Sequence, residues 1–212
     1  MPNPKVSLPV IRRLPRYFRY ITELKSAKKT RVSSSQLAEI MGSTPSQVRQ
    51  DFNCFGGFGQ QGIGYSVDLL HDEIAHLLFP NDSINAVLVG AGSLGATIAN
   101  FVLNEAEKVN LTAIFDNNPN LVGKSLHNIK ISDADSLVDY CHENKVDLLI
   151  VCIPKNAAEK FAVTLAKTGV KGIWNFSHYD FSIYDKSLIV ENVHLRDSLM
   201  ALSYRINHSE EI

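Results

Sequence analysis

A glycine-rich segment between an apolar run and a helical run constrains the fold of this chain most. Residues 84–89 are apolar and short, as in a buried strand, and Gly90-Ala91-Gly92-Ser93-Leu94-Gly95 follows directly. The pattern GxGxxG at a strand-to-helix junction is typical of a dinucleotide-binding turn. The first glycine permits the tight turn, the second lets a pyrophosphate approach the backbone, and the third permits close packing of helix on strand.

An acidic residue after the next apolar run strengthens this interpretation. The second predicted strand, 111–115, is followed by Asp116, which lies 21 residues after Gly95. A carboxylate there can accept hydrogen bonds from the adenosine ribose, and no arginine stands nearby to hold a 2′-phosphate, so NAD(H) is favoured over NADP(H). The alternative is a glycine-rich turn in an α/β domain that binds no ligand.

Helical and apolar runs alternate through the rest of this region, as a parallel sheet with crossover helices requires. The predicted helices are 96–107, 132–144 and 156–168, and the further strands are 147–153, 172–176 and 188–190. Ligands of such sheets bind beyond the carboxyl ends of the strands, which points to the residues around 153 and 175 as the nicotinamide side. Asn175 and Ser177 can equally mark simple strand ends. Beyond the glycine-rich segment and Asp116, the predicted cofactor-binding residues are Asn117, Ile153, Pro154, Asn175 and Ser177.

The first third of the chain has a different charge from the rest. Residues 1–65 hold ten Lys and Arg against three acids, a charge of +7, whereas the remainder carries −8. This asymmetry suits a basic part that meets a polyanion, although a solvated basic face would have the same composition.

Two capped helical runs within the basic third predict a helix-turn-helix. A first helix over 10–28, with a kink or a late start at Pro15, precedes Ser33-Ser34-Ser35-Gln36 and Thr44-Pro45-Ser46-Gln47. Both tetrapeptides fit a capping box, and Gly42 between them fits a left-handed helix end. The second helix would expose polar side chains that can bind base edges or phosphates in a major groove. An ordinary helical hairpin with a polar outer face is the alternative.

The segment after this pattern predicts a wing. Residues 55–65 contain five glycines interleaved with Phe58, Ile63 and Tyr65, which favours a tight β-hairpin over a flexible linker. Together with the charge, this makes binding of double-stranded DNA the leading interpretation. The predicted DNA-binding residues are Arg12, Arg13, Arg16, Thr44, Ser46, Gln47, Arg49, Gln50, Phe58, Gly59, Gln60, Gln61 and Gly62.

The chain is therefore predicted to be an α/β protein in three parts. These are a winged helix-turn-helix domain over 1–80, a Rossmann-type domain over 81–193 and a C-terminal helix over 194–212. Leu195, Leu199, Leu202 and Ile206 give that helix an apolar stripe, which needs a partner on its own domain or on a second subunit. A homodimer suits the DNA interpretation, because a two-fold protein matches a palindromic site.

Several other classes of protein fit this composition poorly. No apolar run reaches the ~18 residues of a membrane span, and the N-terminus lacks a secretory pattern. Cys54, Cys141 and Cys152 give neither a disulfide framework nor a metal pattern, which favours a reducing cytoplasm. Cys54 is the one thiol that could be oxidised, because Cys152 is expected in a buried strand.

Two further functions use the same fold. A dehydrogenase would need an acid–base pair, for which His178 and Tyr179 are the best candidates, and no substrate domain follows the last strand. We therefore expect no catalytic and no metal-binding residues. A module that binds coenzyme A is the other alternative, against which Asp116 argues modestly.

Seven segments across the whole chain resemble the Rex family of bacterial redox-sensing repressors, most closely its clostridial branch. The resemblance implies a homodimer with a domain-swapped C-terminal helix, which NADH releases from A/T-rich palindromic operators of fermentation and respiration genes and which NAD+ allows to bind. The segments are Ile11-Arg-Arg-Leu-Pro15, Val48-Arg-Gln-Asp-Phe52, Phe55-Gly-Gly-Phe-Gly59, Gly62-Ile-Gly-Tyr65, Gly90–Gly95, Trp174-Asn-Phe-Ser177 and Glu191-Asn-Val193.

The chain departs from this family at three places. Gln60-Gln61 stands where many members have basic wing residues, Phe101 near a family tyrosine, and His194 where members often have an acid. That acid is thought to connect the nicotinamide site to an arginine of the DNA-binding domain, here Arg13 or a neighbour. We include His194 among the cofactor-binding residues. A histidine there could make the response depend on pH, or could simply be an exposed or capping residue.

Overall fold

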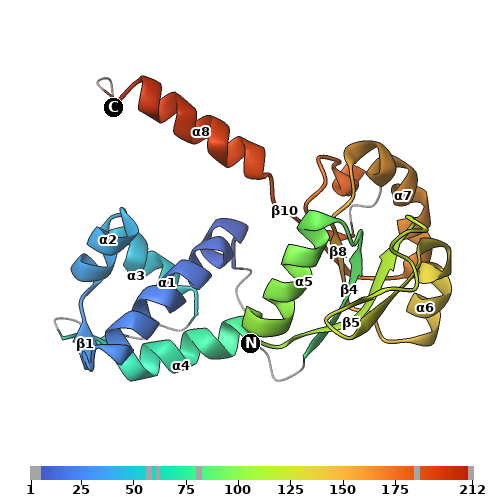
Figure 1. Cartoon of the computed structure of the whole chain (residues 1–212). Coiled ribbons are helices and arrows are strands. Elements are labelled where there is room, and N and C mark those ends of the chain that lie inside the picture. The colour runs from blue at the N-terminus through green and yellow to red at the C-terminus, as the bar shows by residue number, and fades with distance from the viewer. Residues whose placement is uncertain (1–5, 56–58, 61–62, 80–82, 184–186, 210–212) are drawn as a thin grey trace. The chain divides into compact units, whose positions relative to one another are not determined.

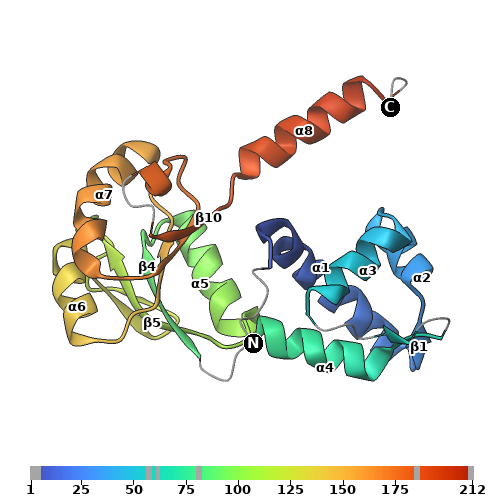
Figure 2. The same cartoon turned by 180° about the vertical axis from the view of Figure 1, so that it is seen from behind.

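The computed structural model describes residues 6–55, 59–60, 63–79, 83–183 and 187–209 (Figures 1 and 2). The contacts divide the chain into two units, Met1–Asp82 and Ser83–Ile212. The C-terminal helix, which we expected as a separate segment, is assigned to the second unit. Within the described ranges, no helix is both long enough and apolar enough to cross a membrane.

The first unit is a winged helix-turn-helix, as predicted. Its three short strands form an antiparallel sheet in the order β1-β3-β2, and the pairing of β2 with β3 forms the predicted hairpin. Its elements are α1 (Leu8–Ser26), β1 (Arg31–Val32), α2 (Ser34–Met41), α3 (Pro45–Asn53), β2 (Gly59–Gln60), β3 (Gly64–Ser66) and α4 (Val67–Leu78).

The caps of α2 and α3 follow the sequence closely, with one difference. Ser33 and Gln36 form a reciprocal capping box on α2, and Gly42 ends that helix at φ 62°. The Thr44 side chain accepts a hydrogen bond from the backbone N–H of Gln47 and caps α3. The Gln47 side chain does not complete a second capping box, because its amide nitrogen donates to a carboxylate one turn further along α3.

Of the kink or late start expected at Pro15, the late start was wrong. Helix α1 begins at Leu8, with Pro9 in its first turn, and continues through Pro15 to Ser26. A proline inside a helix removes one backbone hydrogen bond, which costs about 3 kcal/mol. Burial of Tyr17 and Ile21, both fully inaccessible, offsets this cost by packing α1 into the core of the unit.

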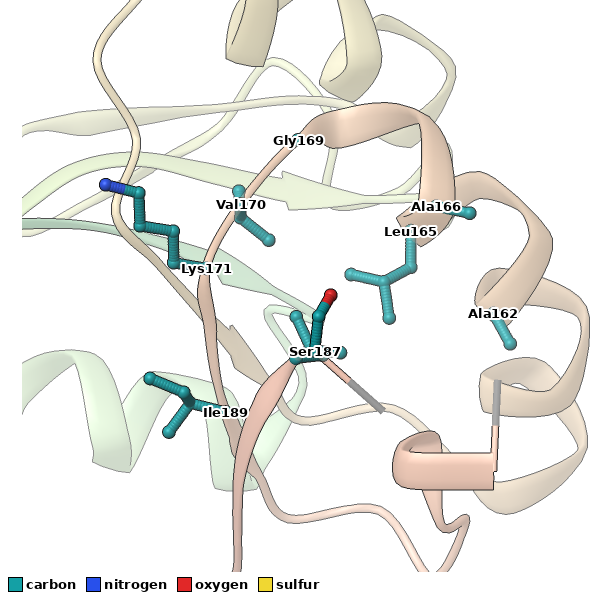
Figure 3. A pocket seen from close by; sticks show the side chains of 9 residues that line it. Ala162, Leu165, Ala166, Gly169, Val170, Lys171, Ser187 and Ile189 are labelled. Atoms are coloured by element: carbon teal, nitrogen blue, oxygen red, sulfur yellow. The ribbon is translucent and has the colours of Figure 1, made fainter. Parts of the chain in front are cut away.

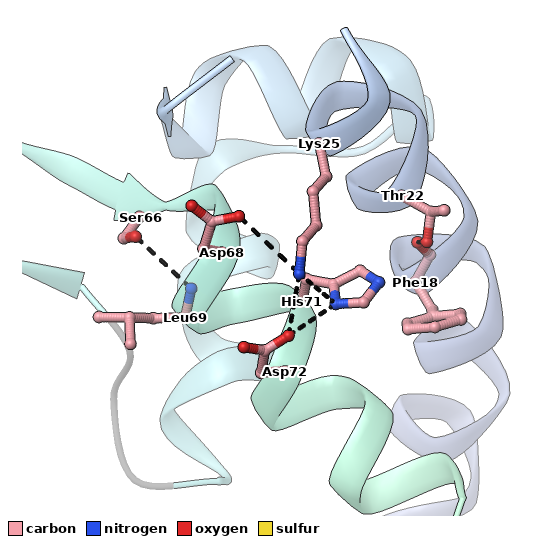
Figure 4. A network of polar contacts seen from close by, with 8 residues as sticks. All are labelled: Phe18, Thr22, Lys25, Ser66, Asp68, Leu69, His71 and Asp72. Carbon is pink, nitrogen blue, oxygen red and sulfur yellow. Dashed lines mark hydrogen bonds and ion pairs between the residues drawn. The ribbon is translucent and has the colours of Figure 1, made fainter. Parts of the chain in front are cut away.

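Helices α1 and α4 are also joined by polar contacts (Figure 4). The ammonium of Lys25 lies 3.1 Å from an Asp72 carboxylate oxygen and 3.2 Å from Nδ1 of His71. The His71 ring also lies 5.0 Å, between centroids, from the ring of Phe18. Because Asp72 is largely exposed, water screens this group, and we assign it a minor share of the stability.

The second unit is a doubly wound α/β domain, as predicted. Its seven strands lie in the order β10-β9-β8-β4-β5-β7-β6, and all neighbours are parallel except β7 and β6. The strands are β4 (Ile84–Val89), β5 (Val109–Asp116), β6 (Ser125–Leu126), β7 (Ile129–Asp133), β8 (Leu148–Val151), β9 (Gly172–Asn175) and β10 (Ile189–Asn192). The helices are α5 (Ser93–Glu105), η1 (Ala134–Ser136), α6 (Leu137–Glu143), α7 (Lys155–Thr168), η2 (Phe181–Ile183) and α8 (Leu195–Asn207).

Alternate residues of the central strand β4 enter two hydrophobic cores, one on each face of the sheet. Val87 and Val89 pack in the core that includes residues of α6 and α7, whereas Ala86 and Leu88 pack in the core that includes residues of α5. This arrangement follows from the two-residue period of a strand and explains why β4 is apolar throughout.

The predicted helix over 132–144 was wrong at its amino end. Ser132 belongs to β7, where it pairs with Phe115 of β5 in a parallel register. The chain then passes through the short helix η1, and α6 begins only at Leu137. The Asp133 side chain accepts a hydrogen bond from the backbone N–H of Asp135 and so starts the helical turn after the strand.

Helix α8 buries none of its residues in this chain. The four side chains of the predicted apolar stripe, Leu195, Leu199, Leu202 and Ile206, are between 51% and 66% exposed. The stripe therefore lacks a cover within the described chain.

Candidate functional site

The three motif glycines sit at the carboxyl end of β4, each for its own steric reason. Gly90 has φ 98°, and a β-carbon on it would lie 2.6 Å from the carbonyl oxygen of Cys152. A β-carbon on Gly95 would overlap the carbonyl oxygen of Gly90, so helix α5 could not pack as closely on the strand. At Gly92, the N-cap of α5, a β-carbon would meet nothing within 4 Å, which leaves the helix start open to a ligand.

A hollow of about 320 Å³ opens beside this turn, at the carboxyl ends of β4, β5 and β8. The strand order reverses between β4 and β8, and ligands of doubly wound sheets bind at that reversal. Six predicted residues line the hollow: Gly90, Gly92, Asp116, Asn117, Ile153 and Pro154. The sequence analysis did not identify the other lining residues, which are Val89, Asn118, Leu121, Ala134, Cys152, Ala157 and Phe161.

Asp116 connects the glycine turn to the loop after β5. One carboxylate oxygen accepts a hydrogen bond from the backbone N–H of Ala91 at 2.6 Å, and the other accepts from Asn118 at 2.7 Å. An ionised carboxylate has about four acceptor positions, so two remain for the hydroxyls of a ribose. None of the residues that line the described hollow is basic, which suits a ribose without a 2′-phosphate.

Asn175 and Ser177 do not line this hollow, and their polar groups are already paired. Asn175 is fully buried, and its amide nitrogen donates to the carbonyl of Tyr179 and to the side chain of Asn192, both at 2.7 Å. Its oxygen accepts from the N–H and the hydroxyl of Ser177. These contacts hold the carboxyl ends of β9 and β10 together.

His194 also lies outside the lining of the hollow. It is the N-cap of α8, and its ring centroid is 5.7 Å from that of His178. Its Nδ1 atom is 3.6 Å from a carboxylate oxygen of Asp197. On helix α5, Phe101 is 39% exposed, with its ring 6.1 Å from that of Trp174.

A second hollow, of about 430 Å³, lies at the other end of the strands (Figure 3). Leu165 and Ala166 of α7 contribute to it, as do Lys171 and Ile189 at the amino ends of β9 and β10. Doubly wound sheets bind nucleotides at the carboxyl ends, so this hollow is a poor candidate for the same ligand.

In the first unit, helix α3 presents the predicted recognition surface. Ser46, Arg49 and Gln50 are exposed on it, and the Arg49 guanidinium donates to the hydroxyl of Ser34 at 3.1 Å. On α1, Arg12 and Arg16 are exposed, and Arg16 donates to the carbonyl of Ile40. In the wing, Gly59 and Gln60 form β2, whereas Phe58, Gln61 and Gly62 lie outside the described residues.

Arg13 is bound within the unit, to a residue that the sequence analysis did not identify. Its Nε and Nη2 atoms donate to the two carboxylate oxygens of Asp51 at 2.6 and 2.7 Å. The Tyr17 hydroxyl and the Gln47 amide also donate to Asp51, at 3.0 and 2.8 Å. The Asp51 side chain is completely buried, whereas that of Arg13 is 31% exposed.

The hydrogen bonds on Asp51 keep it ionised. Burial alone would raise the pKa of Asp51, but the donors Arg13, Gln47 and Tyr17 together hold that pKa below its ordinary value. Conversely, the pKa of Arg13 is raised, chiefly by its hydrogen bond to Asp51. Both shifts favour the charged pair, which joins the recognition helix α3 to α1.

Known proteins resemble this chain along nearly its whole length. Residues 5–53 match a family described as the N-terminus of putative DNA-binding proteins, and residues 81–179 match a family described as a CoA binding domain. A protein of Thermoanaerobacter pseudethanolicus named redox-sensing transcriptional repressor Rex is 47% identical over 206 residues, 97% of this chain and 92% of the relative. A Clostridium botulinum protein of the same name is 45% identical over 205 residues, 97% of each chain.

Solved structures agree with these matches. The repressor RSP in complex with β-NAD+ and operator DNA superimposes with a TM-score of 0.88, at 46% identity, over 97% of this chain and 94% of that one. RSP in complex with β-NADH gives a TM-score of 0.87 at 43% identity, over 97% of this chain and 96% of that one.

Proposed function

The chain belongs to the Rex family of redox-sensing transcriptional repressors, and we propose that it represses transcription in response to the cytoplasmic ratio of NADH to NAD+. Its homodimer binds operator DNA, and NADH releases it. The observation that carries this proposal is one chain with both a winged helix-turn-helix and a glycine-turn hollow with an acid at its edge.

The dinucleotide is assigned to the hollow at the carboxyl ends of β4, β5 and β8. The free N–H groups at the start of α5 would bind the pyrophosphate next to Gly92, and Asp116 would accept from the adenosine ribose. The nicotinamide would lie toward Ile153 and Pro154. The chemistry that differs between NADH and NAD+ is the charge and planarity of that ring, so the sensing contacts belong at this end.

DNA binding is assigned to α3, to the basic side chains of α1 and to the wing. Ser46, Arg49 and Gln50 are exposed on α3 and carry donors and acceptors that suit base edges or phosphates. Arg12 and Arg16 on α1 would neutralise phosphates, which makes the affinity depend on salt.

The dimer would form through the stripe of α8. Its four apolar side chains are exposed in the single chain, and a partner subunit would cover them. We infer an exchange of this helix between subunits from the resemblance to the family. A two-fold dimer would match an A/T-rich palindromic operator.

Negative coupling between NADH and DNA must be reciprocal. If NADH weakens operator binding by a free energy of about 1–3 kcal/mol, the operator weakens NADH binding by the same amount. The effect of NADH on operator binding and the effect of the operator on NADH binding can therefore be measured on one preparation of the protein.

One experiment tests the proposal. Fluorescence anisotropy of a labelled A/T-rich palindromic duplex is measured with the protein alone, with NADH and with NAD+. We expect NADH to weaken binding by about fivefold to 150-fold and NAD+ to preserve it. Binding that ignores both nucleotides would overturn redox sensing and would leave a DNA-binding protein.

Coenzyme A is the second candidate ligand, because residues 81–179 match a CoA-binding family. Asp116 at the edge of the hollow favours NAD(H), since it suits an unphosphorylated ribose. A competition assay monitored by NADH fluorescence distinguishes the two ligands. Displacement of NADH by micromolar CoA would favour coenzyme A as the ligand. The curated relatives are named as repressors, and we assign no enzymatic activity.

A further inference from the structure

Gln47 lies at the flank of the recognition helix, between an exposed surface and a buried carboxylate. It precedes Asp51 by four residues, so the two side chains lie one helical turn apart on the same side of α3. Gln47 is partly exposed and is a neighbour of the exposed Gln50, whereas Asp51 is completely buried. Gln47 can therefore reach both the inside of the unit and a ligand on α3.

The chemistry of Asp51 fixes the orientation of the Gln47 amide. An ionised carboxylate accepts hydrogen bonds and donates none, so the atom of Gln47 at 2.8 Å from it must be the amide nitrogen. The amide oxygen must then point away from Asp51, and no described residue donates a hydrogen bond to it. Without the Asp51 carboxylate to accept from its amide nitrogen, the Gln47 side chain could turn its amide over at little cost.

The Asp51 carboxylate is also held by side chains of α1, so it cannot rotate together with the Gln47 amide. Arg13 engages both of its oxygens, and Tyr17 donates to one of them. These residues belong to α1, which makes the orientation of Gln47 a consequence of how α1 packs on α3.

We propose that Asp51 is a positioning residue that sets the base preference of Gln47 in favour of adenine. This inference rests on the proposed DNA-binding function. With one N–H bound to Asp51, Gln47 offers the groove an acceptor oxygen and one remaining N–H. That pair matches the N6 donor and the N7 acceptor of adenine.

Guanine is disfavoured by the same arrangement. Its major-groove edge presents two acceptors, N7 and O6. A glutamine that is free to turn could offer both of its N–H groups to them, but the held amide would place its oxygen against O6. Asp51 thus makes Gln47, which could otherwise bind either purine, selective for adenine.

The test compares base preferences rather than overall affinity. The full-length wild type, Gln47→Ala, Asp51→Asn and Tyr17→Phe are each incubated with a pool of duplexes randomised over both half-sites, and the bound DNA is sequenced. Tyr17→Phe is the matched control, because it removes one donor from Asp51 and leaves the Arg13 and Gln47 contacts in place.

We expect the wild type to prefer adenine over guanine by about tenfold or more at one position in each half-site. Gln47→Ala and Asp51→Asn should both lose this preference at the same position, and Tyr17→Phe should keep it. A merely structural role of Asp51 would lower enrichment of all duplexes and leave the preference at that position unchanged, which would overturn the inference.

Two outcomes separate this inference from the function on which it rests. A wild type that enriches no duplex contradicts DNA binding itself. A wild type that enriches duplexes whose preferences Gln47→Ala leaves unchanged contradicts only the role of Gln47. If Asp51→Asn fails to fold, Arg13→Lys replaces it: the charge remains, but two-point binding of Asp51 is lost, and the preference for adenine should fall severalfold.

Discussion

Gly95 of α5 packs against the backbone of Gly90, and a β-carbon on Gly95 would overlap the carbonyl oxygen of Gly90. Backbone atoms cannot turn away as a flexible side chain can, so Gly95→Ala must displace α5 from β4. We expect it to destabilise the second unit by about 3 kcal/mol and to abolish NADH binding. Thermal unfolding and NADH fluorescence measure the two effects.

Gly92→Ala is the matched control for this prediction. The same β-carbon meets nothing within 4 Å at Gly92, so the fold should keep its stability within about 1 kcal/mol. Affinity for NADH should nevertheless fall, because the methyl group would occupy the approach of the pyrophosphate. Equal losses of stability in the two variants would contradict this steric account.

Replacing Asp116 should weaken NADH binding while the protein keeps the same fold. Asp116→Ala removes the acceptor for Ala91 and Asn118 as well as the acceptor for the ribose. Loss of charge-assisted hydrogen bonds of this kind costs about 1.5–3 kcal/mol, a rise in Kd of about tenfold to a hundredfold. NADPH should lose less affinity than NADH, because the repulsion of its phosphate disappears. An unchanged ratio of the two affinities would argue against a ribose contact.

Cys152 should be inert to alkylation, although it lines the hollow at the carboxyl ends of β4, β5 and β8. Burial raises the pKa of Cys152 to about 12, so very little thiolate exists at pH 8. Burial also raises the pKa of Cys141. Iodoacetamide labelling followed by peptide mass spectrometry should modify Cys54 first. Fast labelling of Cys152 in the folded protein would contradict this assignment.

The Asp51 carboxylate should make the first unit sensitive to acid. Its pKa is lowered in the folded protein, so its contribution to stability is complete above the unfolded value of about 3.9 and is lost as the pH falls through the folded value. At neutral pH, Asp51→Asn should cost about 3 kcal/mol, because it leaves the buried side of Arg13 without its counter-charge.

The pH dependence of that difference distinguishes the ion pair from simple packing. The difference in unfolding free energy between wild type and Asp51→Asn should be constant from pH 8 to pH 5 and should shrink below about pH 4. Urea unfolding at each pH provides the values. A difference that persists undiminished in acid would mean that the charge of Asp51 contributes little.

A charge in the stripe of α8 should separate the subunits. Leu199 is 66% exposed in the single chain, and a partner would bury it. Leu199→Glu should therefore convert the dimer to a monomer in sedimentation velocity while leaving NADH binding measurable. Ala201→Glu adds the same charge off the stripe and should remain dimeric. A monomeric wild type would contradict the assigned role of α8.

Local patterns were sufficient for much of this protein. The glycine motif and the apolar run before it predict the turn between β4 and α5, because the residues that shape this turn are close in sequence and need no distant partner. The capping box of Ser33 and Gln36 and the left-handed Gly42 are likewise local, and the structure has both. The alternation of apolar runs was enough to predict a parallel sheet.

Patterns were weaker where long-range pairing decides the structure. Ser132 lies in a strand because it pairs with Phe115 of β5. No local signal in the sequence distinguishes this strand from the start of a helix. Leu121, Ala157 and Phe161 are distant in sequence, and they line one hollow only because the strand order reverses between β4 and β8. The expected nicotinamide-side residues Asn175 and Ser177 were chosen from strand ends, but their polar groups are engaged with one another and with neighbours.

The sequence by itself thus determined the family of folds, the glycine turn and the capped helix-turn-helix, since these depend on backbone conformations and periodicities that a few adjacent residues dictate. Only the tertiary structure decided that Arg13, 38 residues away in the sequence, forms an ion pair with the buried carboxylate of Asp51 and that Gln47 also donates to it. The physical reason is burial: a carboxylate removed from water requires donors, and only the packing of α1 on α3 determines which side chains are near enough to supply them.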